Sequence, residues 1–250
     1  MNDIRKSAKD FFDSRAESFH RVSRWALNEE LNRMSDDFMK DLTGNVALEL
    51  GAGSGILITR LKNFKRRIAL DISRNMLSLI EDATVEKIVG DIHHLSLPDE
   101  FADLIICRQV LHYCDLDLAF QNIKRVLKKH GFLHIVQVID FENVPSEWDY
   151  KWASFRGVNN RKHLRVKDLE TAFESHSFKI EKSSRLLLKE QYSWSEFFLK
   201  HNIDRLRENE VKSFFRETPA CISKEIKLTL DDSGISYNRN FGLWLLKLQS

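Results

Sequence analysis

Short apolar runs alternate with amphipathic stretches through the middle of the chain. Buried strands are predicted by the apolar runs at 46–50, 66–71, 86–90, 103–107 and 132–139. Between the last two runs, apolar residues at helical spacing up to Leu127 predict a helix that opens at Asp115 or Asp117. Strands that alternate with helices in this way predict a parallel sheet with helices on both faces.

Both ends of the chain depart from this alternation. Residues 3–40 are rich in charge and carry apolar positions at helical spacing, which predicts two helices. After the alternating part, the pattern predicts a loop at 140–160, a helix near 166–176, a strand at 178–188, helices over 193–231 and an apolar strand at 241–248. The segment 189–238 is therefore expected to be a helical insertion between the last two strands.

The first predicted strand runs directly into a glycine-rich turn. Gly51, Gly53 and Gly55 lie in the sequence ELGAGSG, and the ILITRLKN that follows predicts a helix. Glycine permits a sharp turn and the close approach of a ligand. Glu49 stands just before the turn, where its carboxylate would repel a pyrophosphate. The acid suits a ligand with positive charge, and S-adenosylmethionine carries an ammonium and a sulfonium.

Two more carboxylates follow predicted strands. Asp71 comes twenty residues after Gly51, where nucleotide-binding α/β folds place an acid that accepts hydrogen bonds from ribose hydroxyls. Asp91 follows the next strand and suits an adenine amino group. An acid after a strand is also a common helix N-cap, so the order and spacing of the three acids carry the argument.

These motifs resemble those of the class I S-adenosylmethionine-dependent methyltransferases over about residues 8–140. The most similar group includes the ubiquinone/menaquinone C-methyltransferases and the malonyl-carrier-protein O-methyltransferases. The resemblance implies a Rossmann-like α/β fold, in which a seven-stranded, mostly parallel sheet has an antiparallel last strand and helices on both faces. It also implies one domain over 1–250, with amino-terminal helices at 1–42 over the cofactor, a cofactor-binding core at 43–140 and a lid at 189–238.

The resemblance also assigns cofactor contacts. ELGAGSG matches the motif around the methionine part of the cofactor, and ALDISRNML matches the motif for ribose and adenine. DFFDSRAESFHR resembles a segment that lies over the cofactor, with Phe19 where the family has a tyrosine. The cofactor-binding residues expected from these matches are Glu49, Gly51, Gly53, Gly55, Asp71, Ile72, Met76, Asp91, Ile92 and Arg108.

The segment after the fourth strand, CRQVLHYC, is expected to carry the chemistry. Methyl transfer mainly requires alignment of the acceptor with the sulfonium and exclusion of water, and a base helps only a protonated acceptor. His112 is the candidate base or acceptor-orienting group, because its pKa lies near working pH. Tyr113 is the candidate to close over the methyl group. Packing explains His112 and Tyr113 equally well, and a surface ion pair is the alternative for Arg108.

Other groups have two interpretations. His93 and His94 are adjacent, so their side chains point opposite ways, and no metal site is expected; one of the pair could line the pocket. The basic run at 156–167 could receive an acceptor carboxylate, a phosphate or an acidic carrier protein, or be a solvated loop. An apolar pocket wall, or the core that docks the insertion, is predicted from Trp148, Tyr150, Trp152, Phe155, Tyr192, Trp194, Phe197 and Phe198.

Composition narrows the setting. The 250 residues are 42% hydrophobic, enough for a sizeable core, and the 39 basic and 37 acidic residues leave a net charge of +2. This balance favours neither a nucleic acid nor a membrane as partner. No secretory signal or membrane span is apparent, and three cysteines at unpaired spacing predict reduced thiols in a cytoplasmic protein. We expect a monomer or homodimer.

The leading interpretation is an enzyme that methylates an oxygen, nitrogen or carbon of a small metabolite in a biosynthetic pathway, with S-adenosylhomocysteine as the product. The acceptor could be carboxylated or bound to a carrier protein. A nicotinamide-dependent oxidoreductase is the first alternative, although the turn is G-A-G-S-G rather than G-x-G-x-x-G. A cofactor-binding partner subunit without catalysis is the second.

Overall fold

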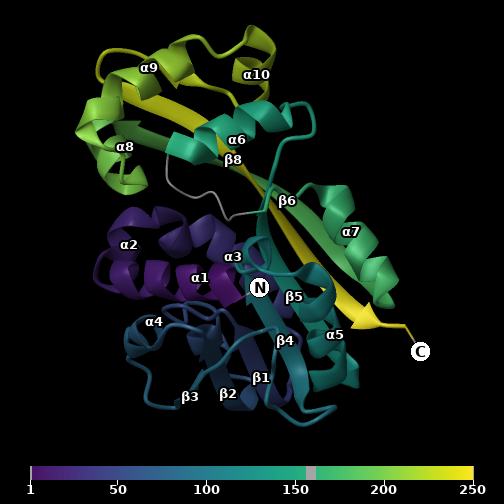
Figure 1. Cartoon of the computed structure of the whole chain (residues 1–250). Coiled ribbons are helices and arrows are strands. Elements are labelled where there is room, and N and C mark those ends of the chain that lie inside the picture. The colour runs from purple at the N-terminus through teal and green to yellow at the C-terminus, as the bar shows by residue number, and fades with distance from the viewer. Residues whose placement is uncertain (1, 156–161, 250) are drawn as a thin grey trace.

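One mixed sheet runs through the protein, whose computed structural model describes residues 2–155 and 162–249 (Figure 1). The strands are β1 (Gly44–Leu50), β2 (Phe64–Asp71), β3 (Val85–Val89), β4 (Ala102–Arg108), β5 (Leu127–Ile139), β6 (Phe178–Ser193), β7 (Thr229–Leu230) and β8 (Gly234–Leu248). Their order is β3-β2-β1-β4-β5-β8-β6, with the two-residue β7 paired to β8. Strands β1 to β5 are parallel, and β8 is antiparallel to both β5 and β6. The predicted α/β fold is confirmed, with β7 as an additional short strand.

Helices cover both faces of this sheet (Figure 1). They are α1 (Asn2–Arg15), α2 (Phe19–Val22), α3 (Glu29–Met39), α4 (Arg74–Ser78), α5 (Leu116–Val126), α6 (Ser146–Phe155), α7 (Val166–Ser175), α8 (Trp194–His201), α9 (Glu208–Arg216) and α10 (Ala220–Glu225). Phe120 of α5 and Phe173 of α7 belong to the core on one face, whereas Leu31 and Phe38 of α3 belong to the core on the other.

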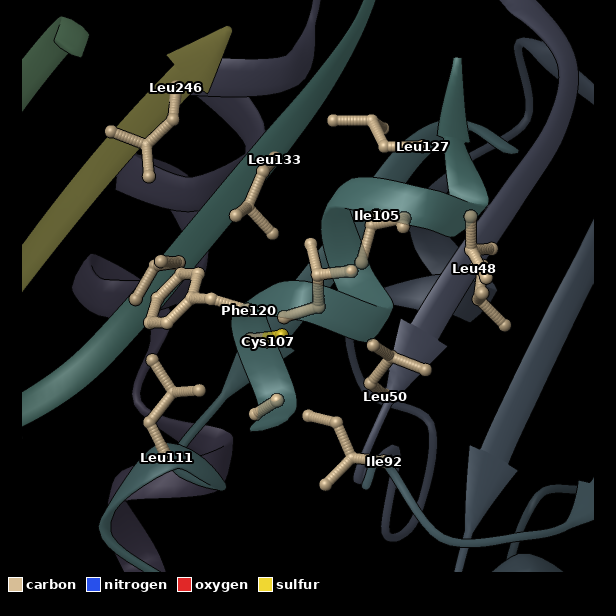
Figure 2. Close-up of a cluster of buried hydrophobic side chains, with 14 of the residues drawn as sticks. Leu48, Leu50, Ile92, Ile105, Cys107, Leu111, Phe120, Leu127, Leu133 and Leu246 are labelled. Atoms are coloured by element: carbon tan, nitrogen blue, oxygen red, sulfur yellow. The ribbon is translucent and has the colours of Figure 1, made fainter. Parts of the chain in front are cut away.

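The central strands supply both cores. Leu48 and Leu50 of β1 pack with α5, while Ala47 packs with α3 on the opposite face. Figure 2 shows the first of these cores, in which Cys107 and Phe120 lie between neighbouring strands and the helix. Because side chains alternate across a strand and both faces are covered, these strands have continuous apolar sequences.

The prediction of a helix after the glycine-rich turn is wrong. The residues of ILITRLKN form only a single 3-10 turn at Ile58–Arg60. The glycine-rich turn occupies the first residues of the connection between β1 and β2. The N–H of Ile58, in the 3-10 turn, donates to a Glu49 carboxylate oxygen at 3.0 Å. Since β2 already begins at Phe64, the remaining chain is too short for a helix that packs back on the sheet.

The chain after β5 also differs from the prediction in two respects. The predicted loop at 140–160 contains helix α6, which buries aromatic side chains rather than a regular apolar stripe. Strands β6 and β8 pair from Phe178 and Leu248 as far as Ser193 and Gly234. Residues 189–193 and 234–238 therefore continue the two strands, and the segment between the strands is 194–233. Figure 1 shows α6, α8, α9 and α10 gathered around the far end of this two-stranded ribbon.

Candidate active site

The glycine-rich turn has the backbone conformation that only glycine adopts readily. Gly51, Gly53 and Gly55 have φ values of 66°, 55° and 71°. A Cβ on Gly51 would lie 2.6 Å from Val110, and one on Gly55 would lie 2.8 Å from Ile80. These two glycines therefore also permit close packing, whereas Gly53 faces a cavity.

This first cavity lies where β1, β2 and β4 end. It brings together most of the predicted site residues: Glu49, Gly51, Gly53, Asp71, Ile72, Met76, Asp91, Ile92, Arg108 and Tyr113. Gly55 and His112 do not line it. Phe12 of α1, Phe19 of α2 and Trp25 close the cavity from the amino-terminal segment. The carboxyl ends of parallel strands are the usual ligand-binding edge of an open α/β sheet.

A buried acid and a buried arginine lie near each other beneath the glycine-rich turn. Glu49 is 2% exposed, and burial raises the pKa of its carboxyl to about 7, opposed by the Ile58 N–H and the charge of Arg108. Burial likewise lowers the pKa of Arg108 to about 10. The Nε and Nη1 of Arg108 are buried without hydrogen-bond partners among the residues that the structure describes. These groups suit a ligand that carries both an ammonium and a carboxylate.

Asp71 links β2 to the glycine-rich turn. One carboxylate oxygen accepts the Gly53 N–H at 2.8 Å, and the other accepts the Ser73 N–H at 2.9 Å. Burial raises the pKa of Asp71, while these two backbone donors oppose the shift. The acid is thus held at the cavity wall, with acceptor capacity left for hydroxyl groups.

Asp91 is fixed by its neighbour His93. The Asp91 carboxylate accepts the His93 backbone N–H at 2.9 Å and lies 2.6 Å from the ring Nδ1. His93 Nε2 accepts the N–H of Asp115 at 2.9 Å, so the proton of the neutral ring is on Nδ1 and is donated to Asp91. His93 lines the first cavity and His94 is exposed. Of the two histidines, His93 is therefore the one at the pocket.

A second cavity adjoins the first. The two cavities share a wall formed by Phe12, Phe19, Trp25, Gln109 and Tyr113. The second cavity is bounded by the end of β5, by α6 and by the upper part of the β6–β8 ribbon. These five side chains therefore lie between the two cavities.

His112 belongs to the second cavity, where it is 4% exposed. The amide Nε2 of Gln137 lies 2.7 Å from His112 Nδ1 and 3.1 Å from the Val138 carbonyl oxygen. Because that carbonyl only accepts, the amide nitrogen must face both groups, and His112 Nδ1 is an acceptor. The neutral ring then carries its proton on Nε2.

Gln109 was not among the residues predicted for the site. It directly follows β4, has a φ of 56° and is 9% exposed. In the described part of the chain its Nε2 is buried without a hydrogen-bond partner. A left-handed glutamine cannot be recognised from residue type, so its position in CRQVLHYC was the available signal.

A group of three potential metal ligands lies at the second cavity. Ligand atoms of Asp140, Asp149 and His163 lie within 4.8 Å of one another. His163 Nδ1 is already 3.1 Å from an Asp140 carboxylate oxygen. Protein hydrogen bonding explains this pair, so we assign no metal to the group.

The aromatic residues predicted to form a pocket wall or a docking core fall into three groups. Trp148 and Trp152 line the second cavity and also join the aromatic core at the end of the ribbon. Tyr150 is 61% exposed. The aromatic core also includes five residues that do not line the second cavity: Phe155, Tyr192, Trp194, Phe197 and Phe198.

The residues of the basic run at 156–167 also lie in different environments. Residues 156–161 lie outside the described part of the chain. Lys162 and Lys167 are exposed, His163 lines the second cavity, and Arg165 donates to the Val144 carbonyl oxygen at 3.2 Å.

Cys107 and Cys114 are buried free thiols, and Cys221 is an exposed one. A search of the described helices finds none with the length and apolarity needed to cross a membrane.

Comparisons with known proteins identify the family. The model of the methyltransferase domain family matches residues 48–135. An uncharacterized protein of Methanocaldococcus jannaschii is 31% identical over 185 residues, which cover 70% of this chain and 76% of the relative. A malonyl-[acyl-carrier protein] O-methyltransferase of Yersinia pestis is 29% identical over 126 residues, covering 49% of this chain and 46% of the relative. The chain spans about half the length of the methyltransferase-like relatives that it matches in Schizosaccharomyces pombe, 45% and 46%.

Solved structures agree on the fold. The YcgJ protein of Bacillus subtilis matches with a TM-score of 0.77 at 18% identity, over 89% of this chain and 100% of that protein. The chain belongs to the class I S-adenosylmethionine-dependent methyltransferases. S-adenosylmethionine is the cofactor of this class, and the acids, glycines and buried arginine of the first cavity fit it. Membership of this family excludes the alternative interpretation as a nicotinamide-dependent oxidoreductase.

Proposed function

We propose that this protein transfers a methyl group from S-adenosylmethionine in the first cavity to a small molecule in the second. The observation that carries the proposal is the wall shared by the two cavities. A methyl group moves directly from sulfur to acceptor, so donor and acceptor must meet at one place that excludes water. Phe12, Phe19 and Trp25 supply apolar surface at that place.

The residues of the first cavity would hold the cofactor by charge and hydrogen bonding. When bound, S-adenosylmethionine supplies a methyl group on a positively charged sulfur that is already an activated leaving group. Glu49 would attract the ammonium, and Arg108 would receive the carboxylate. Asp71 would accept from the ribose hydroxyls, and Asp91 from the adenine amino group.

The residues around the shared wall would orient the acceptor. Gln109 offers an amide donor, and the neutral His112 ring carries its proton on Nε2. Both side chains therefore suit an acceptor oxygen or another lone pair. Tyr113 lines both cavities and stacks edge-on against Phe12, with ring centroids 5.3 Å apart. This contact would place α1 directly against the proposed reaction site.

The amino-terminal helices and the insertion would act as covers of the two cavities. Phe12 and Phe19 cover the first cavity, while Lys200, His201, Phe215 and Ile226 from the insertion line the second. The acceptor is therefore proposed to be chosen mainly by the ribbon, the insertion and α6. A biosynthetic role on a small or carrier-bound acceptor is consistent with the relative from Yersinia pestis. The three free thiols suit the cytoplasm.

Binding and turnover test this proposal separately. Calorimetry should detect S-adenosylhomocysteine binding to the purified protein and no comparable binding of NADH. Labelled S-adenosylmethionine should then yield methylated products with a panel of small acceptors. Failure to bind S-adenosylhomocysteine would contradict the proposal. Binding without turnover of any acceptor would favour the alternative of a cofactor-binding partner subunit.

A further inference from the structure

One part of the second cavity gathers more positive than negative charge. Arg15 at the end of α1, Lys200 of α8 and Arg239 of β8 line it together with Glu190 of β6. These four residues come from distant parts of the chain. The group is called the cationic cluster below.

Glu190 is shared by two of the cations. Lys200 Nζ donates to one Glu190 oxygen at 2.8 Å, and Arg239 Nη1 donates to the other at 3.3 Å. Lys200 also donates to the Tyr192 hydroxyl. The side chains of Glu190, Lys200 and Arg239 are only 4%, 9% and 18% exposed. A single buried carboxylate therefore compensates one buried and one partly buried cation.

Arg15 adds a third positive charge. Its guanidinium lies over the Phe11 ring, 4.5 Å from the centroid, and Nη2 lies 3.5 Å from the Lys200 carbonyl oxygen. Among described side chains, no carboxylate is within ion-pair distance of Arg15. The other two acids of this cavity, Asp140 and Asp149, gather instead around His163. The cationic cluster is thus left with two uncompensated positive charges.

Uncompensated buried charge is costly, and the cost falls when an anion joins the group. We propose that the cationic cluster binds an anionic group of the methyl acceptor, a carboxylate or a phosphate. Two guanidinium groups and an ammonium offer the fork-shaped and point-charge donors that such oxyanions accept. The inference rests on the proposed function, because it takes the second cavity as the acceptor site.

The energetics of the cluster agree with this assignment. Burial lowers the pKa of Lys200 to about 8 even though Glu190 opposes the shift, as expected where negative charge is scarce. The position also suits recognition, since the same cavity reaches Gln109 of the shared wall and His112 beside Tyr113. An acceptor held by its anionic group would present another atom to the methyl donor.

Small anions test the cluster directly. The protein saturated with S-adenosylhomocysteine is titrated with inorganic phosphate, with butyrate and with neutral butyramide. Binding is followed by intrinsic tryptophan fluorescence, to which Trp25, Trp148 and Trp152 at the cavity contribute. We expect saturable binding of phosphate or butyrate and none of butyramide, and the preferred anion identifies the oxyanion. Arg15→Gln should weaken that binding about 10- to 100-fold, as expected for loss of a charge-assisted hydrogen bond. Arg185→Gln, at an exposed position of β6, should leave it unchanged.

Two further measurements keep the outcomes apart. Arg239→Gln should weaken binding of the anion as Arg15→Gln does, while both variants retain the wild-type affinity for S-adenosylhomocysteine. Equal binding of butyrate and butyramide, or anion binding that survives both substitutions, would overturn the inference. A wild-type protein that fails to bind S-adenosylhomocysteine would instead overturn the proposed function.

Discussion

The Gln137 amide and the His112 ring form a hydrogen bond of 2.7 Å in which the histidine nitrogen is the acceptor. The Val138 carbonyl oxygen fixes the direction of this bond, since it holds the same amide nitrogen at 3.1 Å. A buried glutamine thereby selects the tautomer of a histidine that lines the proposed acceptor cavity. His112 is consequently prepared to donate from Nε2 rather than to take up a proton there.

The first prediction follows from that tautomer. The carboxylate of Gln137→Glu would accept from Nδ1 and move the ring proton away from Nε2. Because the acceptor would lose a donor, we expect kcat to fall about 10- to 100-fold, and His112→Ala to give a similar loss. Gln191→Glu, at an exposed position of β6, is the matched control. A rise in kcat with Gln137→Glu would instead mark His112 as a general base.

The second prediction concerns Asp71 at the end of β2. Asp71→Ala removes the acceptor proposed for the ribose hydroxyls and also the partner of the Gly53 N–H. We expect the affinity for S-adenosylhomocysteine to fall by about 1.5–3 kcal/mol, measured by calorimetry. Glu81→Gln, an exposed acid near the same strand, should have no effect. Unchanged affinity in Asp71→Ala would remove this residue from the cofactor site.

The third prediction concerns pH. Burial raises the pKa of Glu49 to about 7, so its carboxyl is protonated below that pH in the free protein. The ionised form attracts an ammonium better, so the affinity for S-adenosylhomocysteine should increase as pH rises through 7. The increase should approach about tenfold per pH unit on the acid side and level off above. Calorimetry between pH 5.5 and 8.5 would measure it, in roughly half-unit steps.

A matched variant isolates the Glu49 contribution. Glu49→Gln keeps the size of the side chain and cannot ionise, so its affinity should be lower and nearly independent of pH over this range. A pH dependence that persists in Glu49→Gln would assign the effect to another group.

The fourth prediction separates the two roles of the insertion. Phe215 belongs to the aromatic core and also lines the second cavity, whereas Trp194 does not line that cavity. The indole N–H of Trp194 donates to the Asp231 carbonyl oxygen at 2.8 Å. Phe215→Leu should raise the KM for an acceptor and leave the affinity for S-adenosylhomocysteine unchanged. Leu206→Ala, at a 92% exposed position, is the control. Equal KM values in wild type and Phe215→Leu would refute acceptor selection by this residue.

Trp194→Ala should act through stability instead. Loss of a buried aromatic side chain costs about 3–5 kcal/mol, which urea unfolding would detect. A change in acceptor KM without a loss of stability would contradict the core role given to Trp194.

The sequence by itself determined the features that depend on residues close to one another along the chain. Apolar runs specified the central strands β1, β2, β4 and β5 where they are buried, since the part of a strand that is covered on both faces must be apolar. The spacing of Gly51 and Gly53 with Glu49, Asp71 and Asp91 indicated one ligand edge, because the carboxyl ends of parallel strands lie side by side.

Only the tertiary structure decided how that edge is covered. Helix α6 and the length of the β6–β8 ribbon were not predicted, because their pattern depends on the partner against which they pack. Arg15, Glu190, Lys200 and Arg239 meet although as many as 224 positions of the 250-residue sequence separate them. Which of these distant side chains share a cavity is set by packing over the whole chain, and no local pattern records it.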